Sequence, residues 1–226
     1  MAAVVAVIGE SARGKTASLA RMNPADVLLV QVVDKMLPFE NARNWVRYDK
    51  ERAPHGNVFV CDSPELITKL ISSTRRPIIV IDDWQYTMSN EFMRRHGEKG
   101  YDKFTEIAYK AWMLLSAAHA LPANKRVYIL THTETKDDGT VQMKTIGRML
   151  NEKMTIEGQF TTVLRAMVRA DEEEPEKRYV FSTRTNGLDP VKSPIGMFAG
   201  AFIPNDLAAV DERVCEYYGI NDGGKE

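Results

Sequence analysis

The sequence predicts an α/β fold in which a mainly parallel central sheet carries helices on both faces. Short apolar segments rich in Val and Ile recur at 2–8, 27–33, 78–81 and 127–130. Each is apolar at successive positions, which is typical of strands that are buried on both faces. Helical patterns lie between these segments, and strands joined by helices usually run parallel. The first apolar segment also runs into a glycine-rich loop, which marks one edge of this sheet as the place to look for a ligand.

The composition is that of an ordinary globular protein. Of the 226 residues, 44% are hydrophobic and 27% are charged, and the net charge is −1. The charge excludes a general electrostatic attraction to nucleic acid, so any such binding must come from local basic patches. We expect one domain over residues 1–220 and a disordered tail over 221–226. Because the glycine-rich loop begins at residue 9, we expect no separate domain before it.

Cysteine usage and the N-terminus predict a cytoplasmic protein. Cys61 and Cys215 lie far apart and belong to no CxxC motif or Cys/His cluster. This argues against a disulfide framework and against a zinc site. The apolar start is about seven residues long, which is too short for a signal peptide or a membrane span.

The glycine-rich loop has the spacing of a P-loop. The segment GESARGKT places Gly9, Gly14, Lys15 and Thr16 in the pattern GxxxxGKT, directly after the first predicted strand. In such a loop the glycines allow backbone N–H groups to point inward at phosphate. The helix that follows adds the positive end of its dipole. We therefore predict a nucleoside triphosphate site, with a tight structural turn as the alternative.

Two side chains of the loop have predicted roles. Lys15 would contact the β- and γ-phosphates as a catalytic residue, and the Thr16 hydroxyl would coordinate Mg²⁺. The predicted nucleotide-binding residues are Gly9, Glu10, Ser11, Ala12, Arg13, Gly14, Lys15, Thr16 and Ala17.

The elements after the loop follow from periodicity and from helix start and stop signals. We predict a helix over 15–22, a strand over 27–33, an irregular excursion over 34–52 and a strand over 57–60. Asn23-Pro24 ends the first of these helices. A polar cap and a first-turn proline start the next helix, which runs to about residue 74.

Two acids follow the strand predicted at 78–81. Four apolar residues that end in Asp82 form a Walker B pattern, so Asp82 is the predicted Mg²⁺ ligand, against a plain turn aspartate. Asp83 could accept a hydrogen bond from the attacking water and orient it. A helix cap or a surface charge is the other interpretation of Asp83. The competing candidates for the water-orienting acid are Glu10, Asp34 and Glu40.

A second polar pair ends the strand predicted at 127–130. Before it, residues 89–103 read as a glycine-punctuated loop, and apolar residues at helical spacing predict a helix over 101–121. Thr131 and His132 would then lie at the carboxyl edge of the sheet, where ligands bind in open α/β folds. His132 is a candidate catalytic sensor of the γ-phosphate; a satisfied loop histidine is the alternative.

The rest of the chain completes the expected domain. Residues 171–176 are predicted to form a solvated acidic turn, and 184–197 a loop rich in Pro and Gly. The other predicted elements are a mobile hairpin over 133–147, a short helix over 148–156, strands over 160–168 and 178–182, and a final helix over 207–218.

The order of these elements separates the kinds of P-loop protein. A nucleotide kinase needs an Arg-rich lid, and no lid motif is evident. A GTPase should carry Asn-Lys-x-Asp, which is absent. An ATPase with an additional strand predicts Walker B well downstream, then a helix, then a strand that ends in a polar sensor. The segments 78–83, 101–121 and 127–132 fit that order.

Several further segments resemble a known family. The succession GESARGKT, IIVIDDWQYTMSNEFMRR, EKGYDKFTEIAYKAW, YILTHTE, KTIGRMLNEKM and VKSPIGMF is similar to phage-encoded ATP-binding proteins with a RecA-type core. These stand near the Sak-type proteins found beside single-strand annealing and single-strand-binding proteins. The resemblance covers essentially the whole chain. It implies a RecA-like, Mg²⁺-dependent ATPase that acts on single-stranded DNA in phage recombination or replication, in the host cytoplasm.

The resemblance also implies roles for two loops and a neighbouring subunit. The loops 94–103 and 133–148 stand where a RecA-type core places its DNA-binding loops, and Tyr101 could stack on a base. Their cations would contact phosphate: Arg94, Arg95, Lys99, Lys103, Lys136, Lys144 and Arg148. Lys192 and Arg184 match the region where such cores present cations to a neighbour's ATP, which implies a homo-oligomer. A phage annealing protein or single-strand-binding protein is the expected partner.

Two other functions are alternatives to a DNA-stimulated ATPase. One is an ATP-gated binding or assembly module with little hydrolysis, which the near-neutral charge and the unassigned catalytic acid favour. The other is a small-molecule kinase.

Overall fold

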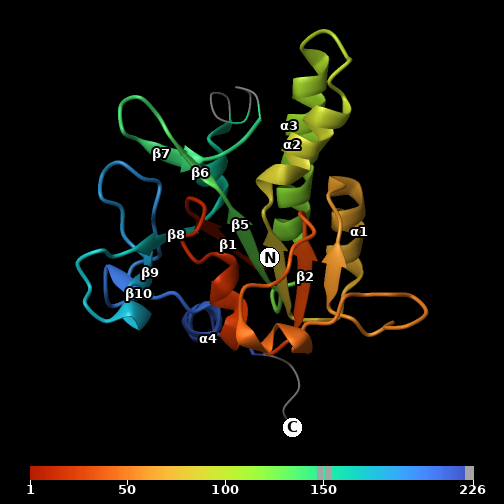
Figure 1. Cartoon of the computed structure of the whole chain (residues 1–226). Helices are drawn as coiled ribbons and strands as arrows, with labels where there is room; N and C mark the ends of the chain where they lie inside the picture. Colours follow the sequence, from red (N-terminus) through yellow and green to blue (C-terminus); the bar gives the residue numbers. More distant parts are fainter. Residues whose placement is uncertain (147–149, 151–153, 222–226) are drawn as a thin grey trace.

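Eight strands form one sheet in the order β10-β9-β8-β1-β5-β4-β2-β3 (Figure 1). The computed structural model describes residues 1–146, 150 and 154–221. The strands are β1 (Ala3–Ile8), β2 (Val27–Gln31), β3 (Val58–Val60), β4 (Ile78–Asp82), β5 (Arg126–Thr131), β8 (Thr162–Val168), β9 (Tyr179–Ser182) and β10 (Phe202–Pro204). The six from β8 to β3 run parallel, while β9 and β10 are antiparallel to their neighbours. The predicted α/β class with a mainly parallel sheet is confirmed.

Strand β5 lies between β1 and β4, so an additional strand separates the P-loop strand from the strand that ends in Asp82. The register pairs Ile8 with Thr131 and Gln31 with Asp82, so the carboxyl ends of these strands lie along one edge. Every residue of β2, β4 and β5 is buried. This is why their sequences are apolar at successive positions rather than alternating.

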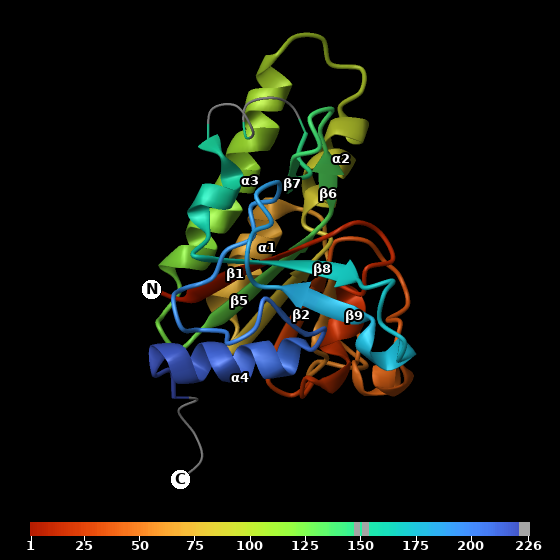
Figure 2. The ribbon, with the colours of Figure 1, turned by 90° about the vertical axis from the view of Figure 1, so that its left-hand side faces the viewer.

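Helices cover both faces of the sheet. One face is covered by α1 (Pro64–Ser73), α2 (Gln85–Arg94) and α3 (Asp102–Ala120), which bury Ile71, Met88 and Leu114 against the strands. The other face is covered by α4 (Leu207–Tyr218), by the 3₁₀ helix η1 (Thr16–Arg21) and by Trp45. Figure 2 shows α4 lying along the opposite side of the sheet from α3. No helix among the residues described is long and apolar enough to cross a membrane.

The helix after the P-loop is a 3₁₀ helix rather than the α-helix that a P-loop predicts. Its last turn is closed by the N–H of Met22, which donates to Leu19 O three residues back. The Ser18 hydroxyl donates to Lys15 O at 2.6 Å. A side-chain hydroxyl that binds a backbone carbonyl competes with the regular helical ladder, and short helices often tighten in this way.

Residues 85–94 form a helix where the sequence analysis expected part of a loop. Trp84, Met88 and Phe92 stand four residues apart and all pack into the core beside α3. This spacing is a helical signal. The glycines that suggested a loop, Gly97 and Gly100, lie beyond the end of α2.

Other elements agree with expectation except in detail. The hairpin of β6 (Thr133–Thr135) and β7 (Val141–Met143) is confirmed, with Gly139 at φ +82° in its turn. Strand β10 was not predicted. The predicted helix over 148–156 lies mostly outside the described residues, as does the tail from 222 to 226. The remaining 3₁₀ helices are η2 (Glu40–Asn44), η4 (Ile156–Gln159) and η5 (Pro175–Lys177).

Candidate functional site

The loop from Gly9 to Thr16 is shaped to present backbone N–H groups. Ala12 and Gly14 have positive φ values, +61° and +87°. Residues of left-handed conformation set among right-handed ones make a concave nest of N–H groups that binds anions. Both glycines are also required by close approach. A Cβ at Gly9 would lie 2.9 Å from Ala166 O, and a Cβ at Gly14 would lie 3.0 Å from the ring of Tyr179.

Lys15 is folded back onto its own loop. Its Nζ donates to Gly9 O at 2.7 Å and to Glu10 O at 2.8 Å, and the residue is buried. Burial lowers the pKa of Lys15 to about 8, against the opposing attraction of Asp83 and Asp82. In the loop as it stands, the ammonium of Lys15 is hydrogen-bonded to neutral carbonyl oxygens. An anion would form stronger, charge-assisted hydrogen bonds with this ammonium and would replace those carbonyl oxygens.

Thr16 and Asp82 are brought together from the P-loop and from β4. The Thr16 hydroxyl lies 3.0 Å from each carboxylate oxygen of Asp82, although the two residues are 66 apart in sequence. Asp82 is 1% exposed. Its burial, and then the neighbouring Asp83, raise its pKa to about 6. A hydroxyl beside one buried carboxylate is an oxygen donor set suited to Mg²⁺, which takes few protein ligands and completes its shell with water and phosphate.

Asp83 is held between two basic side chains. Its Oδ2 accepts from Lys35 Nζ at 2.5 Å, and its Oδ1 lies 3.4 Å from His132 Nε2. Burial opposes ionisation of Asp83, but the hydrogen bonds from His132 and Lys35 outweigh it and lower its pKa to about 2. Its φ of +65° is unusual for a residue with a side chain. The carboxylates of Asp82 and Asp83 both lie within 3.6 Å of Lys35 Nζ.

Lys35 is a site residue that the sequence analysis missed. It follows β2, and its Nζ lies 3.6 Å from Asp82 Oδ2 as well as against Asp83. Burial lowers its pKa, but the two carboxylates raise it by more, so Lys35 is charged. A cation in the segment after one strand, where the partner strand leads into two acids, was a usable signal. It needed the pairing of β2 with β4, which the sequence alone does not give.

Gln85 positions His132. Its Oε1 accepts from the Thr131 hydroxyl at 2.9 Å and from the His132 backbone N–H at 3.1 Å, and the residue is buried. The start of α2 is thereby tied to the carboxyl end of β5. The structure thus joins the predicted pair Thr131 and His132 to the Asp82 and Asp83 turn through one amide side chain.

The P-loop, Lys35, Asp83 and His132 line a cavity of about 320 Å³ at the carboxyl edge of the sheet. Its lining residues are Ser11, Ala12, Arg13, Gly14, Lys15, Thr16, Ala17, Lys35, Pro38, Asp83, His132 and Tyr179. A second cavity of similar volume, about 330 Å³, lies at the other end of β1, beside His119 and Tyr218. No P-loop residue lines that second cavity. The predicted triphosphate site is therefore the first.

The competing acids are placed less favourably than Asp83. Glu10 pairs with Arg13 at 2.6 Å, and Asp34 pairs with Arg47 at 2.9 Å with both side chains 61% exposed. Glu40 is exposed at the start of η2. None of these three lines the cavity that holds Lys15.

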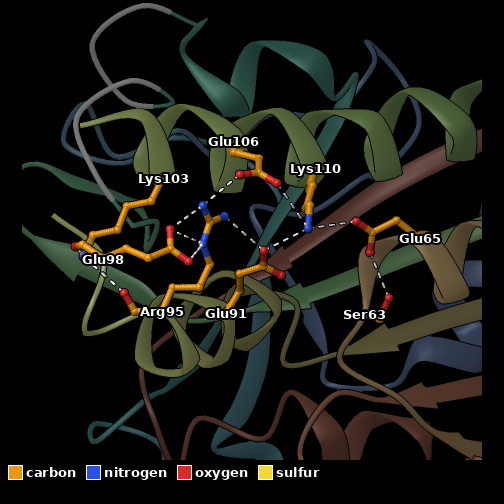
Figure 3. Close-up of polar contacts among 8 residues, drawn as sticks. All are labelled: Ser63, Glu65, Glu91, Arg95, Glu98, Lys103, Glu106 and Lys110. Carbon is orange, nitrogen blue, oxygen red and sulfur yellow. Dashed lines mark hydrogen bonds and ion pairs between the residues drawn. The ribbon is translucent and has the colours of Figure 1, made fainter. Parts of the chain in front are cut away.

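The predicted DNA-binding cations of the first loop are mostly engaged with acids and carbonyls (Figure 3). Arg95 pairs with Glu98 at 2.7 Å and with Glu106 at 2.8 Å. Lys103 Nζ donates to Glu98 O at 2.8 Å. Arg94 pairs with Asp62. Lys99, the fourth of these residues, is exposed. The network binds α2 to α3 and leaves little of the positive charge of Arg95 and Lys103 for phosphate.

The remaining predicted cations lie on the hairpin and on the loop after β9. Lys136 and Lys144 are exposed on the β6–β7 hairpin, while Arg148 lies outside the described residues. Lys192 is exposed and its backbone pairs with Val163. Arg184 donates to Ala199 O at 3.1 Å. Neither Lys192 nor Arg184 lines the cavity of its own chain.

Two of the three comparisons with known proteins found no match. No family model matches the chain, and no curated protein matches it. Among solved structures, the chain is similar to the genome packaging NTPase B204 from Sulfolobus turreted icosahedral virus 2, in complex with ATP-gammaS. The identity is 10%, the TM-score is 0.38, and the match covers 75% of this chain and 77% of that one. The assignment of the site therefore depends on its own geometry.

Proposed function

We propose that this chain binds ATP with Mg²⁺ at the P-loop and hydrolyses it. The observation that carries the proposal is that the Thr16 hydroxyl meets the buried carboxylate of Asp82 beside a cavity that Thr16 itself lines. Thr16 lies within hydrogen-bond distance of both oxygens of Asp82, and Lys15 lines the same cavity. A poised lysine, a hydroxyl and a buried carboxylate beside an N–H nest are the parts that a triphosphate and its metal require.

Each protein group has a distinct task in binding. The backbone N–H groups of the loop would hold the phosphates, and Lys15 would exchange Gly9 O and Glu10 O for phosphate oxygens. Thr16 and Asp82 would hold Mg²⁺, Asp82 directly or through water. The metal supplies neutralisation of the charge on the β- and γ-phosphate oxygens.

Hydrolysis needs a group that orients water. Asp83 is ionised and lies in the cavity, and its carboxylate can accept a hydrogen bond from a water in line with the γ-phosphate. His132 and Lys35 both contact Asp83 and face the same space. Either could turn toward the terminal phosphate when it is present, which would release Asp83 for water.

Among P-loop proteins, the strand order supports a RecA-like ATPase. Strand β5 is inserted between the P-loop strand and the Walker B strand, and it ends at Thr131, directly before His132, where a polar sensor is expected. The sequence lacks the guanine-binding motif Asn-Lys-x-Asp, which argues against a GTPase. It also shows no Arg-rich lid motif, which argues against a nucleotide kinase.

The proposal extends to single-stranded DNA as the regulator of hydrolysis. The β6–β7 hairpin and the α2–α3 turn extend from the same end of the molecule in both views (Figures 1 and 2). The hairpin carries the exposed cations Lys136 and Lys144, and Tyr101 on the turn is 87% exposed. Cations with an exposed ring suit sequence-independent binding of a single strand. A role in phage recombination, beside an annealing or single-strand-binding protein, rests on the resemblance of the motifs.

The alternative is an ATP-gated module that hydrolyses little. The observation that favours it is that Lys35 and His132 each contact one carboxylate oxygen of Asp83. With both oxygens already in contact with a basic group, the carboxylate is less free to bind the attacking water.

The experiment is to measure Mg²⁺-ATP binding by calorimetry and phosphate release by a coupled assay. We expect binding and turnover by the natural sequence, and loss of binding by at least tenfold in Lys15→Ala, because its ammonium offsets phosphate charge. Lys50→Ala, at an exposed lysine that does not line the cavity, is the matched control. Equal affinity of Lys15→Ala and the natural sequence would contradict the proposal. Binding without turnover would favour the gated module.

A further inference from the structure

Tyr179 stands at the wall of the cavity that faces away from the acids. It is the first residue of β9 and pairs with Val168, so it lies at the same sheet edge as the P-loop. Strands β4, β5 and β2, which bring Asp82, His132 and Lys35, lie on one side of β1, whereas β8 and β9 lie on the other. The cavity is therefore polar and charged at one end and carries an aromatic ring at the other.

The position of the ring is fixed by the loop itself. The Tyr179 ring is so close to Gly14 that a Cβ there would lie 3.0 Å from its Cδ1, and the same Cβ would lie 3.2 Å from Asn205 Oδ1. The backbone N–H of Asn205 donates to Tyr179 O at 3.2 Å. Despite these contacts, 45% of Tyr179 is exposed, and it lines the cavity. One surface of the ring is held by the protein while another stays accessible.

We propose that Tyr179 is the stacking platform for the nucleobase, an inference that rests on the proposed ATP site. The terminal phosphate must face Asp82 and Asp83, so the nucleoside must leave the P-loop in the other direction. Tyr179 offers an aromatic surface to the cavity, which Ser11, Ala12 and Arg13 of the loop also line. Aromatic rings stack on bases with little dependence on sequence, because every base has a π-face. The ligand class is therefore a nucleoside triphosphate, with its base recognised by stacking rather than by hydrogen bonds.

The test compares a ligand that has a base with one that lacks it. Calorimetry measures binding of Mg²⁺-ATP and of Mg²⁺ with inorganic triphosphate to the natural sequence, Tyr179→Ala and Tyr179→Phe. We expect Tyr179→Ala to weaken ATP binding by about 5- to 100-fold and to leave triphosphate binding unchanged. Tyr179→Phe keeps the ring and should retain ATP affinity. Tyr218→Ala is the matched control, because Tyr218 is also 45% exposed but lines the other cavity.

The outcomes separate this inference from the proposed function. If Tyr179→Ala weakens ATP and triphosphate equally, the ring supports the P-loop backbone and the stacking role is overturned. If it weakens neither, the base lies elsewhere and the inference also fails. In both cases Lys15→Ala still reports on the P-loop, because it should weaken both ligands. Unchanged binding of both ligands in Lys15→Ala would instead overturn the ATP site itself.

Discussion

At the scale of single residues, the site is organised by charge held in a confined space. Two adjacent carboxylates, Asp82 and Asp83, are both buried, and like charges so close would oppose each other's ionisation. Their pKa values are displaced in opposite directions, to about 6 and about 2. The difference arises because His132 and Lys35 both contact Asp83, whereas the deeper burial of Asp82 raises its pKa by more than the hydrogen bond from Thr16 lowers it. The pair thus holds one firmly ionised acid and one that ionises less readily.

The role of Asp83 leads to a residue-scale prediction. In Asp83→Asn we expect ATP turnover to fall by about 100- to 10,000-fold, because an amide is a far weaker acceptor for the proton of the attacking water. ATP affinity should change by no more than a few-fold. Asn tolerates positive φ, so the turn at +65° can be kept. Phosphate release and calorimetry on the same preparation measure both quantities.

A matched control exists for this substitution. Asp62 is also ion-paired, with Arg94, but it lies outside the cavity. Asp62→Asn should leave turnover unchanged. If Asp83→Asn hydrolyses ATP at the natural rate, Asp83 is not the water-orienting acid.

At the scale of elements, α4 is attached to the sheet by a buried polar cluster as well as by apolar contacts. Arg126 donates to both oxygens of Asp211, at 3.0 and 2.9 Å, and the Tyr128 hydroxyl donates to Asp211 at 2.7 Å. Arg126 and Tyr128 belong to β5, whose other end carries Thr131. Strand β5 therefore links the packing of α4 to the edge that holds the site.

This cluster gives a stability prediction. Asp211→Ala leaves the buried guanidinium of Arg126 and the hydroxyl of Tyr128 without their shared carboxylate. We expect the free energy of unfolding to fall by about 3–5 kcal/mol, the usual cost of removing one partner of a buried pair. Urea denaturation followed by circular dichroism measures it. Glu212→Ala, at an exposed position of the same helix, should change stability by less than about 0.5 kcal/mol; a comparable loss in both variants would mean that the cluster adds nothing specific.

At the scale of the whole molecule, positive charge is distributed unequally between the two projecting loops. Around the α2–α3 turn, Arg95 and Lys110 form ion pairs with glutamates of the two helices and the turn, namely Glu91, Glu98 and Glu106 (Figure 3). The hairpin cations Lys136 and Lys144 are exposed. We infer that a single strand of DNA would be held by the hairpin more than by the turn.

The distribution predicts different salt dependence for different lysines. The double variant Lys136→Ala with Lys144→Ala should bind single-stranded DNA more weakly and lower the slope of log affinity against log salt by about 1.4, since each phosphate contact on a single strand contributes about 0.7. Fluorescence anisotropy across salt concentrations measures the slope. Lys50→Ala with Lys69→Ala changes the net charge equally at exposed positions elsewhere and should leave the slope unchanged. Equal slopes in both double variants would remove the hairpin from the proposed DNA site.

The sequence by itself determined the strand that leads into the P-loop, the acid pair at the end of β4 and the polar end of β5. These features could be predicted because each depends on residues that are neighbours in the chain. A continuous apolar segment indicates a strand buried on both faces. The glycine loop or the acid that completes the motif follows directly after that segment. Only the tertiary structure decided which distant groups share the cavity. Lys35 acts there because β2 pairs with β4, Gln85 because α2 starts against β5, and Tyr179 because β9 folds back beside β8. Strand order brings these side chains together, and no spacing within the chain encodes that order. The same physical reason explains why Arg95 and Lys103 read as free cations in the sequence, whereas packing of α2 against α3 surrounds them with acids and carbonyl oxygens.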